Sequence, residues 1–152
     1  MSDIRRIVTG HDRSGRAIFV ADGKAQSQLT RGVETTNLWL HRGAPDNSGE
    51  YADPVTAAVP LEPPVGGTVL RIVDFPPTDD GSSPDMHRTA SLDYAYVIEG
   101  EIYAVLDDDS TVMHTGDVLI QRGTNHGWVN RSDRPCRVLF VLLDAEPVSP
   151  AT

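Results

Sequence analysis

Residues 87–100 read HRTASLDYAYVIEG, and this stretch decides the fold that the sequence predicts. If it is extended, alternate side chains point to the same side, so His87, Thr89 and Asp93 share one face. Tyr94 and Tyr96 then point the other way. The pattern therefore predicts a strand with ionisable groups at one end of an apolar inner wall, as at the mouth of a barrel with a pocket.

A second stretch, residues 116–130, reads GDVLIQRGTNHGWVN. It predicts a strand that ends at Gln121, a turn that contains glycine, and a second strand that His126 opens. Trp128 and Asn130 share the face of His126 in this second strand. We expect the turn to bring His126 back beside the strand that precedes it.

Short runs rich in β-branched and aromatic residues recur along the rest of the chain between Gly, Pro and Asp, which is typical of strands. No segment has the pattern of a long amphipathic helix. The sequence thus predicts an all-β sandwich or barrel, with a tight hairpin turn at Glu99-Gly100 and a hairpin tip at Asp107–Asp109. The predicted strands are Arg5–Val8, Ala17–Ala21, Glu34–His41, Thr68–Phe75, Leu92–Glu99, Glu101–Leu106, Thr111–His114, Asp117–Gln121, Gly127–Asn130 and Arg137–Asp144.

Composition narrows the classes of function. A chain of 152 residues has room for one domain, and a formal charge of -9 disfavours nucleic acid and anionic membranes as partners. The start of the chain lacks the apolar core of a signal peptide, and no apolar run approaches the length that spans a bilayer, so we expect a cytoplasmic protein. The single cysteine, Cys136, stands beside an apolar run and is expected to be buried.

The first stretch resembles the first sequence motif of the cupin superfamily. That motif reads H-x-H, three or four residues, E, six residues and G. This chain has His87-x-Thr89, three residues, Asp93, six residues and Gly100.

The second stretch resembles the second cupin motif, which reads G, five residues, P-x-G, two residues, H, three residues and N. Here Gly116 is followed by four residues, Gln121-x-Gly123, two residues, His126, three residues and Asn130. The resemblance implies a single-domain cupin-type β-barrel, also called a double-stranded β-helix or jelly roll, over residues 1–152. Its N-terminal strands, at about 1–66, would precede the motif-bearing barrel at about 67–146.

In cupins that bind metal, the ligands come from both motifs and correspond here to His87, Thr89, Asp93 and His126. A threonine replaces one histidine, and an aspartate replaces the glutamate. The remaining two histidines and one carboxylate are the donor types of a non-haem iron site. The resemblance therefore implies one divalent metal ion (Fe, Zn, Mn or Ni) on His87, Asp93 and His126. A metal-free pocket, in which Asp93 and a histidine form an acid–base pair, is the alternative, and a purely structural role for these residues is the third.

The resemblance also implies an enzyme that acts on a small molecule. We expect lyase, decarboxylase, dehydratase or isomerase chemistry on a small organic acid or a polyketide-like carbonyl compound. The alternatives are an iron-dependent dioxygenase and a binding barrel without catalysis. The predicted catalytic residues are His126, Asp93 and His87, and the predicted ligand-binding residues are Thr89, Gln121 and Trp128. The apolar N-terminal strands predict a homodimer.

Overall fold

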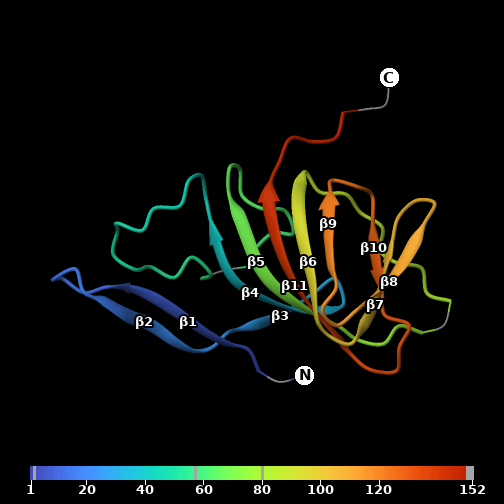
Figure 1. Ribbon diagram of the computed structural model, residues 1–152, viewed down its shortest axis with the longest axis horizontal. Helices are drawn as coiled ribbons and strands as arrows, with labels where there is room; N and C mark the ends of the chain where they lie inside the picture. Colours follow the sequence, from blue (N-terminus) through green and yellow to red (C-terminus); the bar gives the residue numbers. More distant parts are fainter. Residues whose placement is uncertain (2, 57, 80, 150–152) are drawn as a thin grey trace.

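The computed structural model describes residues 1, 3–56, 58–79 and 81–149 of the chain (Figure 1). Within these ranges the chain forms strands and no helix, so none is long and apolar enough to cross a membrane. The strands of the described residues are β1 (Arg5–His11), β2 (Ala17–Lys24), β3 (Ser27–Thr30), β4 (Val33–His41), β5 (Thr68–Phe75), β6 (Ser91–Glu99), β7 (Glu101–Val105), β8 (Ser110–His114), β9 (Val118–Arg122), β10 (Gly127–Val129) and β11 (Cys136–Asp144).

The predicted all-β fold is confirmed, and every predicted strand is present. The bounds of β5 are those expected, whereas β1 and β2 run on to His11 and Lys24. Strand β3 was missed, because its four residues are mostly polar and its one large apolar side chain, Leu29, faces solvent. It forms because its backbone pairs with β4. The local sequence pattern does not predict this pairing.

The strands are arranged in two sheets and a separate ribbon. The larger sheet has the order β3-β4-β5-β11-β6-β9, and the smaller has the order β10-β7-β8. Among the described strands, β1 and β2 pair only with each other, and in Figure 1 their ribbon extends away from the two sheets. Two strands that precede residue 66, β3 and β4, thus belong to the larger sheet.

The prediction of a hairpin at Glu99-Gly100 is wrong. Strand β6 lies in the larger sheet and β7 in the smaller one, so the chain passes here from one sheet to the other. Gly100 has φ of 90°, and a Cβ at this position would lie 2.9 Å from the carbonyl oxygen of Pro135. Glycine allows this sharp corner because it tolerates both the positive φ and the close approach. The hairpin tip at Asp107–Asp109 is confirmed by the pairing of β7 with β8.

The apolar core lies between the two sheets and is built by alternation along the strands. On β6, Asp93, Ala95 and Val97 are buried, whereas Tyr94 and Tyr96 are exposed, as the sequence predicted. The predicted burial of Cys136 is also confirmed. The buried core residues are Val73, Ala95, Val97, Ile102, Ala104, Met113, Cys136, Val138, Phe140 and Leu142.

Candidate active site

A cavity of about 440 Å³ opens at the end of the core that lies near the start of β6. Its volume is in the range of pockets that bind small molecules. All the predicted site residues line it: His87, Thr89, Asp93, Gln121, His126 and Trp128. The structure therefore brings both sequence motifs to one cavity, although it does not test the role of each residue.

Asp93, Gln121 and His126 form a buried hydrogen-bonded chain. Asp93 and Gln121 lie opposite each other on β6 and β9. The Gln121 amide donates to Asp93 Oδ2 at 2.9 Å, and its nitrogen lies 3.0 Å from His126 Nε2. An amide nitrogen has two protons, so one nitrogen serves both acceptors. Gln121 thus fixes the carboxylate and the imidazole in one geometry.

The contacts of His126 define its protonation. Its Nδ1 lies 2.9 Å from the carbonyl oxygen of Thr124, which can only accept, so Nδ1 carries the proton. Nε2 is then the free lone pair that accepts from Gln121. Burial lowers the pKa of His126, because desolvation disfavours the charged imidazolium. His126 is therefore neutral at pH 7.

His87 lies at the rim of the same cavity. Its backbone forms an isolated bridge with that of His126, through hydrogen bonds of 2.8 and 2.9 Å. The two imidazole rings have centroids 4.3 Å apart. Its Nδ1 contacts the carbonyl oxygen of Asp85 at 2.9 Å, which leaves Nε2 unprotonated in the neutral form. His87 is only half-buried and hence reaches both solvent and the cavity.

The remaining predicted site residues, Trp128 and Thr89, form walls of the cavity. Trp128 packs against Phe140 and Phe75 with ring centroids 5.4 and 6.3 Å away, and its ring meets His126 edge-on at 6.1 Å. Thr89 is buried and accepts a hydrogen bond of 2.8 Å from Ser91 Oγ. The cavity is accordingly aromatic on one side and polar around Asp93.

The sequence reasoning missed Arg71, which also lines the cavity. Arg71 is in the middle of β5, and its side chain is 4% exposed. Its neighbours on the same strand face, Val69 and Val73, are buried core residues. A charged residue among apolar residues on the inward face of a predicted strand was the pattern that could have identified Arg71 as a site residue.

A metal ion does not fit the donor set as the side chains lie. The amide nitrogen of Gln121 stands between Asp93 and His126, and Thr89 offers a neutral hydroxyl that is already engaged with Ser91. In the ranges that the structure describes, no three His, Cys, Asp or Glu side chains are grouped so that they could hold a metal ion. The metal set His87, Asp93 and His126 stays a prediction.

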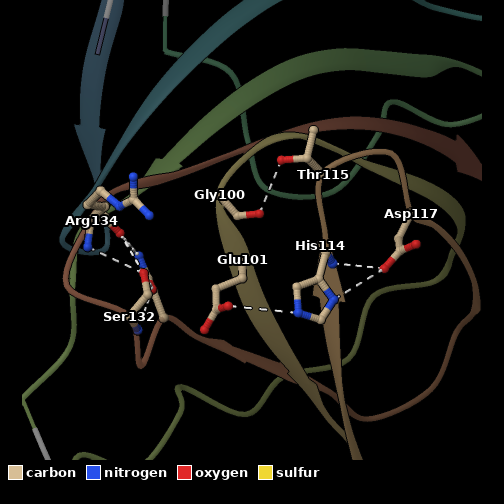
Figure 2. Close-up of polar contacts among 8 residues, drawn as sticks. Gly100, Glu101, His114, Thr115, Asp117, Ser132 and Arg134 are labelled. Carbon is tan, nitrogen blue, oxygen red and sulfur yellow. Dashed lines mark hydrogen bonds and ion pairs between the residues drawn. The ribbon is translucent and has the colours of Figure 1, made fainter.

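A second polar hollow lies at the other end of β6 (Figure 2). His114 stands between Glu101 and Asp117, with ring nitrogens 3.8 and 3.9 Å from their carboxylate oxygens. All three side chains are more than 40% exposed. Exposed ion pairs of this kind are solvated and contribute little, so the cluster carries no argument for a second site.

Comparison with known proteins agrees with this architecture. Residues 71–142 match the family described as cupin domain. The chain is 40% identical to phomopsin biosynthesis cluster protein C' of Diaporthe leptostromiformis, over 94% of this chain and 79% of that protein. It is 33% identical to the cupin-domain-containing oxidoreductase fogC of Aspergillus ruber, over 97% of this chain and 76% of that one.

Among solved structures, the polyketide cyclase RemF from Streptomyces resistomycificus superposes with a TM-score of 0.54. The two chains are 23% identical over 82% of this chain and 77% of that one, a level at which the likeness shows the fold alone. The fold is a β-barrel in which the two sequence motifs line one pocket. The chain belongs to the cupin superfamily, as a cupin-2-like protein.

Proposed function

We propose that this protein is an enzyme that moves a proton on a small carbonyl compound, and thus has lyase, dehydratase, decarboxylase or isomerase activity. The observation that carries the proposal is the buried carboxylate of Asp93. Its Oδ2 is held by Gln121, whereas its Oδ1 has no hydrogen-bond partner among the described residues. A buried carboxylate oxygen without a partner is costly, and a substrate proton supplies what it lacks.

The neighbouring groups fit this role. Asp93 Oδ1 is the base that takes the proton, and Gln121 keeps the carboxylate aimed. His126, which is neutral, is the second group that can exchange a proton, once a substrate proton replaces the Gln121 N–H at its Nε2. Trp128 gives an apolar wall against which an aromatic or polyketide-like substrate can stack.

The test is proton exchange at carbon. A panel of aryl ketones is incubated in D2O with the protein, and loss of the signal of the hydrogen next to the carbonyl is followed by ¹H NMR. Asp93→Asn should slow the exchange by about 10²–10⁴-fold, the contribution typical of a general base. Asp117→Asn, a change of the same kind on the exposed surface, should exchange as wild type does. Equal rates in wild type and Asp93→Asn contradict the proposal.

An oxidoreductase is the second candidate, and the names of relatives favour it. The relative from Aspergillus ruber and that from Hypocrea virens, 35% identical over 94% of this chain, are both named cupin-domain-containing oxidoreductases. Such an activity, an iron-dependent dioxygenase included, requires a redox partner. A divalent ion on His87, Asp93 and His126 would require that the Gln121 amide move away from Asp93 and His126. Elemental analysis of protein purified without chelator or metal-affinity resin distinguishes the candidates. One equivalent of iron that is lost in His126→Ala supports the second; metal-free protein that catalyses proton exchange supports the first.

We also propose a homodimer. The β1–β2 ribbon exposes Ile7, Ile18 and Phe19, and a two-stranded ribbon is at best marginally stable in water. The edge strand β9 exposes Val118 and Ile120 on the larger sheet. A second copy related by a two-fold axis can cover both surfaces reciprocally.

Light scattering at tens of micromolar should give twice the mass of one chain. Phe19→Ser should shift the protein towards monomer, whereas Leu29→Ser, an equally exposed change outside the ribbon, should not. A wild-type monomer at this concentration contradicts the proposal.

A further inference from the structure

Arg71 is a buried positive charge without a negative partner in hydrogen-bond contact. Of the described groups, only the carbonyl oxygen of Pro60 accepts from its guanidinium, at 2.7 Å, and its Nε has no partner. Asn37, opposite Arg71 on β4, has an unpartnered Oδ1, but a neutral amide cannot balance the charge. Burial lowers the pKa of Arg71 to about 10, so the side chain is still charged at pH 7.

Asp93 presents the opposite case in the same cavity. It is buried, its Oδ1 lacks a donor, and no described arginine or lysine forms an ion pair with it. Its charge nevertheless acts on Arg71, since it is the influence that opposes the lowering of the pKa of Arg71. The cavity therefore holds one donor and one acceptor that do not bond to each other.

These two groups discriminate between the substrate classes that the sequence left open. A carboxylate ligand would be attracted by Arg71 but would bring a second negative charge into the cavity that holds Asp93. A carbonyl compound with an acidic proton avoids this repulsion, because its oxygen accepts from Arg71 while its proton faces Asp93. The aromatic wall of Phe75, Trp128 and Phe140 also suits an uncharged body.

We infer that Arg71 and Asp93 together bind an uncharged, enolisable carbonyl compound, and that Arg71 is a catalytic residue that stabilises the oxygen as it becomes negative. The proton on the carbon next to the carbonyl passes to Asp93 Oδ1. The electron pair of that C–H bond forms a C=C bond, and the carbonyl π electrons move to the oxygen, which the guanidinium holds as an enolate. Return of the proton from Asp93 to another atom completes an isomerisation. This inference rests on the proposed function for its proton transfer, but the binding that it predicts is measured without turnover.

The probe is benzoylacetone, an uncharged aryl diketone whose enolate absorbs at longer wavelength than the neutral form. It is titrated into the full chain at pH 7, and the difference spectrum gives both affinity and enolate fraction. Wild type should bind it and shift it towards the enolate. Arg71→Met should lose at least about tenfold in affinity together with the spectral shift, because it removes hydrogen bonds from a charged donor. Arg71→Lys, which keeps the charge, should recover part of both.

Three comparisons make the test decisive. Asp93→Asn should still bind benzoylacetone through Arg71 but should give a smaller spectral shift than wild type, because the oxygen that takes the proton is lost while the donor remains. The acid 3-benzoylpropionate should bind wild type more weakly than benzoylacetone. Arg122→Met, which removes an exposed arginine beside the site, should behave as wild type.

The inference is overturned if folded Arg71→Met binds benzoylacetone as wild type does, if wild type does not bind it at millimolar concentration, or if the acid binds more tightly through Arg71. Circular dichroism establishes that each variant is folded. If the Arg71-dependent shift is present while proton exchange is unaffected by Asp93→Asn, the proposed function fails and the binding of the carbonyl compound stands.

Discussion

Two buried arginines, on opposite faces of the larger sheet, show how differently the same side chain can be used. Arg137 on β11 lies opposite Asp74 on β5, and its guanidinium donates two hydrogen bonds of 2.6 Å to that carboxylate. Arg71, also on β5, lines the cavity, and among the described residues its guanidinium donates only to the carbonyl oxygen of Pro60. The hydrogen bonds with Asp74 raise the pKa of Arg137, whereas burial lowers that of Arg71.

The difference separates a charge that supports the fold from a charge that is free for a ligand. On the face of the larger sheet that points away from the core, Arg137 and Asp74 are each other's counterpart. At the cavity, Arg71 and Asp93 each have an atom without a hydrogen-bond partner in the part of the chain that the structure describes. A chain that keeps a buried charge unsatisfied has it available for something that binds. This division between the two faces can be tested by substitution.

The largest effect is expected for Arg137→Met. It leaves Asp74 buried and without its ion pair, which costs about 3–5 kcal/mol of unfolding free energy. Urea denaturation followed by circular dichroism measures the loss. A change below about 1 kcal/mol would show that the site of Arg137 tolerates an unpaired Asp74, and the contrast between the arginines would disappear.

A large effect on reactivity is expected at Cys136, beside Arg137. Burial raises the pKa of this thiol to about 11, so thiolate is scarce at pH 8 and alkylation by iodoacetamide should be about two orders of magnitude slower than for a free thiol. The pKa of Cys136 is higher in the folded than in the unfolded protein. Any free energy of unfolding that the buried thiol contributes is therefore present below the unfolded pKa and is lost as the pH rises from there towards 11. Mass spectrometry follows the modification, with protein in urea as the fast control. Equal rates in both states would contradict the burial.

Arg71→Met should change stability much less than Arg137→Met does. It removes a desolvated charge and puts an apolar side chain in its place, at the loss of one bond to Pro60, so the unfolding free energy should stay within about 1 kcal/mol of wild type or rise. The same urea titration gives the value. A loss comparable to that of Arg137→Met would assign Arg71 to the fold and would weaken the case for its role in binding.

The smallest effect is expected for His114→Ala in the exposed hollow of Figure 2. Its contacts with Glu101 and Asp117 are solvated, so stability should change by about 0.5 kcal/mol or less, and proton exchange should not change. Thermal unfolding and the ¹H NMR assay check both. A loss of activity would place chemistry at the end of β6 that we assign to the fold.

Strand β6 shows how much of the site the sequence alone predicted. Alternation placed Thr89 and Asp93 on the inner face and Tyr94 and Tyr96 outside, because a strand has a period of two wherever it lies. The turn between Gln121 and His126 predicted that His126 returns beside the strand that ends at Gln121, and the resemblance to the cupin motifs implied that both lie near Thr89 and Asp93. Glu99-Gly100 was misread because a local pattern shows where a chain turns, but not whether the next strand joins the same sheet.

The sequence by itself determined the all-β class, the strands and the two motif segments, since each depends on neighbours along the chain. Only the tertiary structure decided that Gln121 donates to both Asp93 and His126 and that Arg71 enters the same cavity. Arg71 is on β5, and its register against β4 and β11 turns it inward. Whether a charge has a partner depends on such pairings between distant strands, and no spacing within a segment encodes them.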